Sequence, residues 1–180
     1  MNEAYPTKCQ KNLKLIPFVA EVHLGVLKKW VLSHEDLILF GGPSVFTYPL
    51  SDEEWGVFLD VASEKRSSFM VADDREGAFL GFAQIREMSP TTKRLCRLLV
   101  GQSKMRGQGI GKQLVQALLE HCFQDPNLAH VELNVYTHNA RAIRCYSRCG
   151  FTNAPETSPN PTDTLNWQAI RMVRSRDMLV

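Results

Sequence analysis

The segment from residue 94 to residue 124 constrains the fold more than any other part of the chain. Its first seven residues, RLCRLLV, form an apolar run that predicts a strand over 94–100. After a glycine-rich stretch, apolar residues recur at helical spacing, which predicts an amphipathic helix over 107–124 with one buried face. A strand that leads directly into such a helix indicates a chain with both strands and helices. The apolar face of this helix would consist of Ile110, Leu114, Val115, Leu118, Leu119, Cys122 and Phe123.

The turn between this strand and this helix has the composition of an anion site. Gly107, Gly109 and Gly111 alternate along it, and glycine lets the backbone turn its N–H groups toward a closely approaching ligand. The start of a helix adds unsatisfied N–H donors and about half a positive charge. Arg106 and Lys112 carry charges of the same sign. The sequence therefore predicts a phosphate-binding turn.

Two common phosphate motifs do not fit this turn. The P-loop pattern would need glycine where Arg106 stands, and serine or threonine where Gln113 stands. The dinucleotide pattern G-x-G-x-x-G fails because Gly111 comes one place too early. The pattern that remains is Arg106-x-x-Gly109-x-Gly111.

The rest of the chain alternates between strand and helix patterns. Ser51 and Glu54 form a capping box, while Gly41-Gly42-Pro43 and a proline-rich stretch over 152–163 indicate loops. No linker divides the sequence, so we expect a single domain over residues 1–180 with a mixed sheet. The expected strands are 12–19, 67–73, 78–87, 94–100, 130–136 and 167–174, and the expected helices are 20–33, 52–63, 107–124 and 139–149.

Composition narrows the class of partners. The 21 basic and 19 acidic residues give a net charge of +2, which offers no general attraction for nucleic acid or an anionic membrane. Five cysteines without a C-x-x-C pair predict neither a disulfide framework nor a metal site. The N-terminus lacks a signal-peptide pattern, and no apolar run reaches membrane-spanning length. We expect a cytoplasmic protein, either a monomer or a homodimer.

A second motif follows the glycine turn. Residues 139–151 match N-x-x-A-x-x-x-Y-x-x-x-G-F through Asn139, Ala142, Tyr146, Gly150 and Phe151. Together with R-x-x-G-x-G, this pattern resembles the GNAT superfamily of N-acetyltransferases over residues 94–152. Within that superfamily, the segment looks most like the ribosomal-protein-alanine branch.

The resemblance implies an α/β (α+β) fold: a mixed, mostly antiparallel central sheet with splayed central strands, flanked by helices. Acetyl-CoA would enter the gap between strands 94–100 and 130–136, with no metal. Backbone groups of Leu98, Leu99 and Val100 would pair with the pantetheine arm, and Asn139 would bind near its acetyl end. The pyrophosphate would be held by Arg106, Gly107, Gln108, Gly109, Ile110, Gly111 and Lys112.

By the same resemblance, Tyr146 is the catalytic general acid that protonates the departing thiolate. Asn139 and Tyr146 lie seven residues apart, close to two helical turns, so the spacing independently places them on one helix face. Backbone N–H groups near Val100 would stabilise the oxyanion. Direct transfer leaves no role for Cys96 or Cys145 as a nucleophile.

The general base and the acceptor stay open. Related alanine acetyltransferases have a glutamate where this chain has Asn134, and Glu87, Glu132, His138 or a water chain could replace it. The acceptor would be a peptide N-terminus or a small-molecule amine. Its site could be walled by aromatic residues, although packing in the core is the more frequent role of such side chains. They are Trp30, Phe40, Tyr48 and Trp55. The missing glutamate also motivates an alternative, a non-catalytic acyl-CoA-binding sensor.

Overall fold

The fold is built on one seven-stranded sheet with the order β1-β2-β3-β4-β5-β7-β6. A computed structural model describes residues 13–42, 46–60, 62–74, 76–101, 105–154 and 167–178. Only the β4–β5 pair is parallel, and every other neighbouring pair is antiparallel. The expected mixed, mostly antiparallel sheet is therefore confirmed. The strands are β1 Leu13–Pro17, β2 Arg66–Asp73, β3 Phe79–Ser89, β4 Thr92–Val100, β5 His130–Tyr136, β6 Thr152–Asn153 and β7 Ala169–Ser175.

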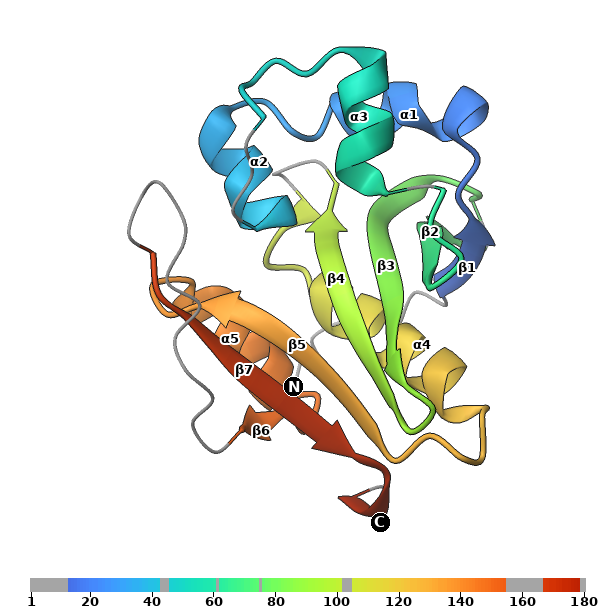
Figure 1. Ribbon diagram of the computed structural model, residues 1–180, viewed down its shortest axis with the longest axis vertical. Helices are drawn as coiled ribbons and strands as arrows, with labels where there is room; N and C mark the ends of the chain where they lie inside the picture. Colours follow the sequence, from blue (N-terminus) through green and yellow to red (C-terminus); the bar gives the residue numbers. More distant parts are fainter. Residues whose placement is uncertain are drawn as a thin grey trace, which may run out of the picture.

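The two central strands, β4 and β5, are paired over only part of their length and then separate. Pairing between β4 and β5 runs only from Thr92 opposite His130 to Leu95 opposite Leu133. Beyond that point, β4 continues to Val100 and β5 to Tyr136 without pairing to each other. Figure 1 shows β5 and β7 diverging from β4 toward the helical end of the molecule. The expected splay is confirmed.

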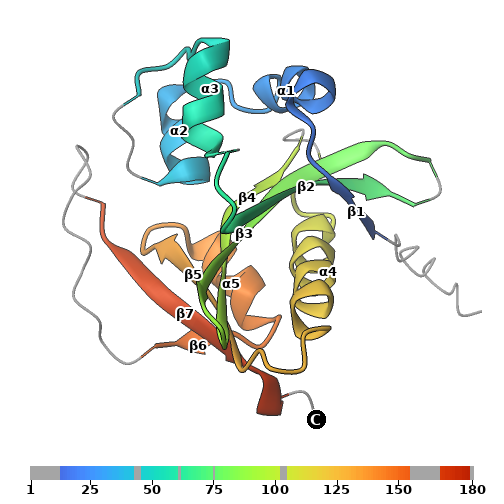
Figure 2. The ribbon, with the colours of Figure 1, turned by 45° about the vertical axis from the view of Figure 1, so that its right-hand side comes forward.

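Helices cover both faces of the sheet. They are α1 Ala20–Lys28, α2 His34–Gly41, α3 Asp52–Leu59, α4 Ile110–Phe123 and α5 Ala140–Ser147. One core joins α4 and α5 to the sheet through side chains such as Leu114 and Leu133. A second core joins the first three helices to Phe82 and Leu99. Figure 2 shows α1, α2 and α3 as one group, separated from α4 and α5 by the strands.

Several expected boundaries were wrong. The apolar residues 37–40 belong to α2, which begins after Ser33, whose Oγ accepts a hydrogen bond from the Asp36 backbone N–H at 3.0 Å. Since Ser33 caps a new helix, α1 ends at Lys28 instead of continuing to residue 33. The capping box of α3 is confirmed, with both reciprocal bonds present, although the helix ends at Leu59. The short strand β6 was not expected, and most of the expected loop over 152–163 lies outside the described residues.

Helix α4 begins three residues later than expected. Gly107 and Gly109 have φ values of 87° and 88°, which a right-handed helix cannot accommodate. Both glycines therefore belong to the turn, and the first helical residue is Ile110. Within the described residues, no helix has the length and apolar character that crossing a bilayer requires.

Candidate active site

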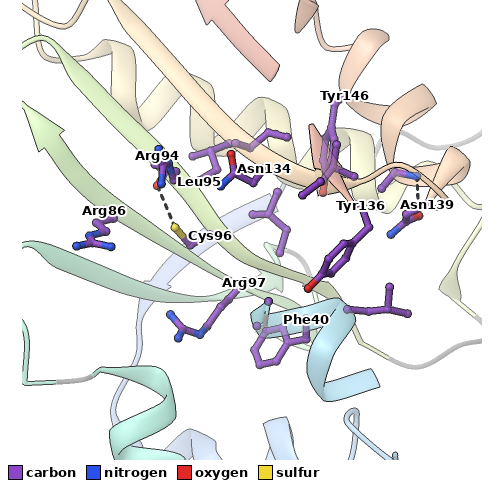
Figure 3. A pocket seen from close by; sticks show the side chains of 18 of the residues that line it. Phe40, Arg86, Arg94, Leu95, Cys96, Arg97, Asn134, Tyr136, Asn139 and Tyr146 are labelled. Carbon is purple, nitrogen blue, oxygen red and sulfur yellow. Dashed lines mark hydrogen bonds between the residues drawn. The ribbon is translucent and has the colours of Figure 1, made fainter. Parts of the chain in front are cut away.

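A cavity of about 390 Å³ opens where β4 and β5 separate. Its walls come from the end of α2, from β2 to β5, from α5, from the first residue of β7 and from Trp167, which precedes β7. Figure 3 shows Tyr136, Asn139 and Tyr146 on one side of it and Arg86, Arg94 and Arg97 on the other. The cavity thus forms where the sheet has lost its internal pairing.

The glycine turn leaves the head of α4 open to a ligand. Gly109 is the N-cap residue and has no side chain, so the first turn receives no side-chain cap. The first backbone N–H groups of a helix have no partner within it, and here they lie beside an exposed turn. Ile110 is buried in the core, so it could contribute only its backbone. This arrangement fits a diphosphate.

Cationic side chains surround the same turn. Arg106 and Lys112, both predicted to bind the diphosphate, are exposed next to it. Arg141 comes from α5, and its Nη2 lies 3.5 Å from the position that a Cβ on Gly107 would occupy. The sequence analysis missed Arg141, whose only signal is its place in the first turn of the helix that carries the second motif. Three cationic residues therefore lie in or beside the turn, and Arg141 approaches it most directly in the structure.

Asn139 and Tyr146 both line the cavity, as expected from their spacing. The Oδ1 of Asn139 accepts a hydrogen bond from the Ala142 backbone N–H at 3.1 Å, which leaves its NH₂ group as a donor. Burial, reinforced by Cys145 and Cys149, raises the pKa of the Tyr146 phenol. The hydroxyl is protonated at neutral pH, as a general acid must be, and the raised pKa makes it a weaker proton donor than an exposed tyrosine. The roles of both residues stay predictions.

The residues predicted to face the pantetheine arm differ in their surroundings. Leu98 lines the cavity, whereas the Leu99 side chain lies in the second core. Val100 packs beside the head of α4, with its Cγ2 3.6 Å from where a Cβ on Gly111 would lie. The prediction concerns their backbone groups and is unaffected by these side-chain positions.

A bulge interrupts β4 next to the cavity. Arg97 has a φ of 47°, and the register between β3 and β4 shifts between Phe82 and Gln84. A bulge of this kind re-aims a side chain relative to the regular alternation. Leu95 faces the core under α4, but Arg97 lies over the Phe58 ring on the opposite side, 4.8 Å from its centroid. The bulge thereby turns the Arg97 guanidinium toward the cavity.

Three side chains were considered as the general base: Glu132, His138 and Glu87. None of them both lines the cavity and lacks a contact with another side chain. Glu132 is 6% exposed and paired with Arg94, whose Nε lies 2.7 Å from its Oε1, and with Arg171 at 3.6 Å. The His138 ring stacks on Tyr136 and lies 4.3 Å from the Trp167 ring, outside the cavity lining. Glu87 is exposed opposite Lys93 near the β3–β4 turn. We therefore assign no base.

The aromatic candidates for the acceptor wall divide into core and cavity residues. Trp30 and Trp55 are buried in the second core, and Tyr48 lies outside the cavity lining. Phe40 lines the cavity, as does Trp167, which was not anticipated. No local pattern around Trp167 predicts that it lines the cavity, because its position there depends on how β7 pairs with β5.

Two neighbouring thiols influence one another: Cys145 lies in the last turn of α5, and Cys149 follows the end of that helix. A hydrogen bond with Cys149, helped by nearby Arg148 and Arg141, lowers the pKa of Cys145 to about 7 against the opposing effect of burial. The Cys145 Sγ lies 3.7 Å from where a Cβ on Gly111 would be. Among the described histidine, cysteine and acidic residues, no group of three or more could hold a metal ion.

Comparisons with known proteins agree with this geometry. A profile of the acetyltransferase (GNAT) family matches residues 37–151. The aminoglycoside N(6')-acetyltransferase type 1 of Klebsiella pneumoniae is 33% identical over 90 residues, which cover 50% of this chain. The match spans only 42% of that relative's length.

Solved structures of similar architecture cover nearly the whole chain. AAC(6')-Ib in complex with ribostamycin and coenzyme A has a TM-score of 0.73 at 24% identity, covering 92% of this chain and 94% of that one. The spermidine N-acetyltransferase of Vibrio cholerae, in complex with CoA and spermine, has a TM-score of 0.74 at 16% identity. That match covers 92% of this chain and 96% of the other. At these identities, the likeness establishes a shared fold.

Proposed function

The chain belongs to the acetyltransferase (GNAT) family, and from that membership we propose that it moves an acetyl group from acetyl-CoA to the primary amine of a small molecule. One observation carries the proposal. The cavity at the splay holds the Tyr146 phenol, and the uncapped turn before α4 lies at the end of β4, one of the two splayed strands. A thioester donor with a diphosphate needs both features.

The choice of a small acceptor rests on the relatives. Those described above are named for aminoglycosides and spermidine, which are small-molecule amines. They do not come from the ribosomal-protein-alanine branch that the second motif favours. A peptide N-terminus therefore becomes the less favoured acceptor and belongs in the test as a separate arm.

Acetyl-CoA would supply an activated acetyl thioester, and the residues of this chain would bind and orient it. The N–H groups at the head of α4, with Arg106, Lys112 and Arg141, would hold the diphosphate. The NH₂ group of Asn139 would orient the end of the pantetheine arm. Tyr146, which lines the cavity and is protonated at neutral pH, would donate its proton to the departing sulfur. Backbone N–H groups of β4 near Val100 would stabilise charge that develops on the carbonyl oxygen.

The exchange Tyr146→Phe tests this function. Thiol release should fall about a hundredfold or more, the usual contribution of a general acid, while CoA binding measured by calorimetry stays unchanged. Tyr48→Phe removes the same hydroxyl outside the cavity and serves as the matched control.

The amines offered should include small monoamines, diamines, amino acids and a peptide with a free N-terminus. CoA binding without thiol release for any of them would favour the non-catalytic sensor instead. An unchanged rate in Tyr146→Phe would remove the tyrosine from the mechanism.

A further inference from the structure

Arginines dominate the charge of the cavity. Four of its lining residues are Arg66, Arg86, Arg94 and Arg97, and no aspartate or glutamate stands among the described lining residues. We propose, on the basis of the acetyl transfer proposed above, that the acceptor is a small amine that also carries a carboxylate or phosphate group. The arginines would bind that acidic group and leave the amine facing the thioester.

The sheet register aligns three of these arginines. Arg66 pairs opposite Arg86, and Arg86 pairs opposite Arg94, so the three side chains share one face of β2, β3 and β4. Like charges directly opposite one another on neighbouring strands destabilise a sheet. A row of this kind costs folding free energy, and binding of an anion would recover it.

The local acids neutralise only part of this row. Arg66 pairs with Asp60, with its Nε 3.2 Å from the carboxylate, and Arg94 pairs with Glu132 at the end of the row. Arg86 and Arg97 have no ion-pair partner within the described residues. Two guanidinium groups are therefore left for an anion.

Arg97 is held in place as a binding group would be. Its Nη1 donates to the Oε1 of the fully buried Gln84 at 2.7 Å, and Arg66 donates to the same oxygen at 3.2 Å. Its Nε is buried and has no hydrogen-bond partner among the described residues. Burial and the nearby Arg66 lower its pKa to about 10, so it stays charged at neutral pH. A buried donor without a partner is costly, and the charge of this guanidinium, which belongs to a residue lining the cavity, remains available to an oxyanion.

The four arginines of the cavity also disfavour binding of an acceptor with several positive charges. A diamine or polyamine would bring a second positive charge toward guanidinium groups that already repel one another. The charge of the cavity thus selects among small amines by the group they carry beyond the reacting nitrogen.

Acceptors of similar size but different charge test the proposal. The probes are propylamine, 1,3-diaminopropane, β-alanine and 2-aminoethyl phosphate, each assayed for thiol release and also titrated calorimetrically into the protein saturated with CoA. The anionic probes should bind and react with kcat/KM at least about tenfold above the diamine, a typical gain for a charge-assisted contact. Comparing the affinities of β-alanine and 2-aminoethyl phosphate shows whether the cavity binds a carboxylate or a phosphate more tightly.

Charge reversal at Arg86 supplies the second test, because this exposed side chain has no described partner whose loss would unfold the protein. Arg86→Glu should raise KM for β-alanine about tenfold or more, with a smaller change in kcat and none in CoA affinity. Arg86→Lys should retain most of the preference. Lys14→Glu reverses an exposed charge on β1 outside the cavity and should change nothing.

The outcomes separate this inference from the function on which it rests. Equal or better binding and turnover of the diamine would overturn the anionic acceptor while leaving acetyl transfer intact. Binding of the anionic probes without thiol release from any amine would reject the transfer and leave the anion site standing. Failure of both anionic probes to bind would reject the inference outright.

Discussion

Glycine serves two different purposes in the turn before α4. Gly109 has a φ of 88°, in the left-handed region that an L-residue enters only at a cost, and nothing lies near the position of its missing Cβ. Gly111 has a helical backbone, and a Cβ there would make ordinary contacts with Val100 and Cys145. The first glycine is required by conformation, whereas the second is not.

This difference predicts unequal effects of the same substitution. Gly109→Ala should weaken CoA binding about tenfold, because keeping the turn in shape would cost about 1–2 kcal/mol. Gly111→Ala should change the dissociation constant little. Calorimetric titration with CoA measures both, and equal losses in the two variants would show that the phosphate site does not depend on the conformation of the turn.

At the scale of elements, α5 is placed so that one thiol contacts the head of α4. Helices α4 and α5 pack together, and Cys145 lies between Cys149, just beyond the end of its own helix, and Gly111 on α4. Cys122, on the buried face of α4, has its pKa raised to about 11 by burial. Two thiols on neighbouring helices should therefore differ sharply in reactivity.

Alkylation by iodoacetamide should report this difference. The thiolate is the reactive form, so a pKa lowered to about 7 predicts that the Cys145 rate rises with pH and is half-maximal near pH 7. Cys122 should remain unmodified there. Replacing the hydrogen-bond partner, Cys149→Ala, should move the Cys145 profile toward higher pH. Peptide mass spectrometry assigns the modified residue, and a midpoint near pH 9 that ignores Cys149 would contradict the geometry.

For the molecule as a whole, one buried amide ties several elements together. Gln84 on β3 donates to the Leu59 carbonyl at 2.6 Å and to the Ser68 hydroxyl at 2.8 Å, while its oxygen accepts from Arg66 and Arg97. It thereby joins α3, β2 and β4 at the edge of the cavity. By contrast, the buried Oε1 of Gln113 on α4 has no partner among the described residues.

The two glutamines should respond in opposite ways to the same replacement. Gln84→Leu leaves buried polar partners unsatisfied and should lower the free energy of unfolding by about 3 kcal/mol. Gln113→Leu removes a buried polar atom that satisfies nothing, so stability should stay within about 0.5 kcal/mol or rise. Urea denaturation of both variants makes the comparison, and similar losses would mean that Gln84 holds no network.

Much of the local structure, including the glycine turn before α4, follows from the sequence alone. Helix periodicity over 110–123 and alternation over 130–136 depend only on which residues must be buried, so both elements were predicted closely. The capping box at Ser51 was equally local. Helix α2 was not predicted, because its apolar residues are followed directly by Gly41-Gly42, a pair that is typical of a loop. The signal that could have revealed it is Ser33 with Asp36 three residues later.

Tertiary structure alone decided the charge of the cavity. Arg66, Arg86 and Arg94 belong to three different strands, and the register between those strands brings them into one row. The bulge that turns Arg97 toward them arises from a mismatch between β3 and β4, which no single strand displays in its sequence. Register and bulges depend on how one strand pairs with another, so the residue pattern of a single strand cannot specify them.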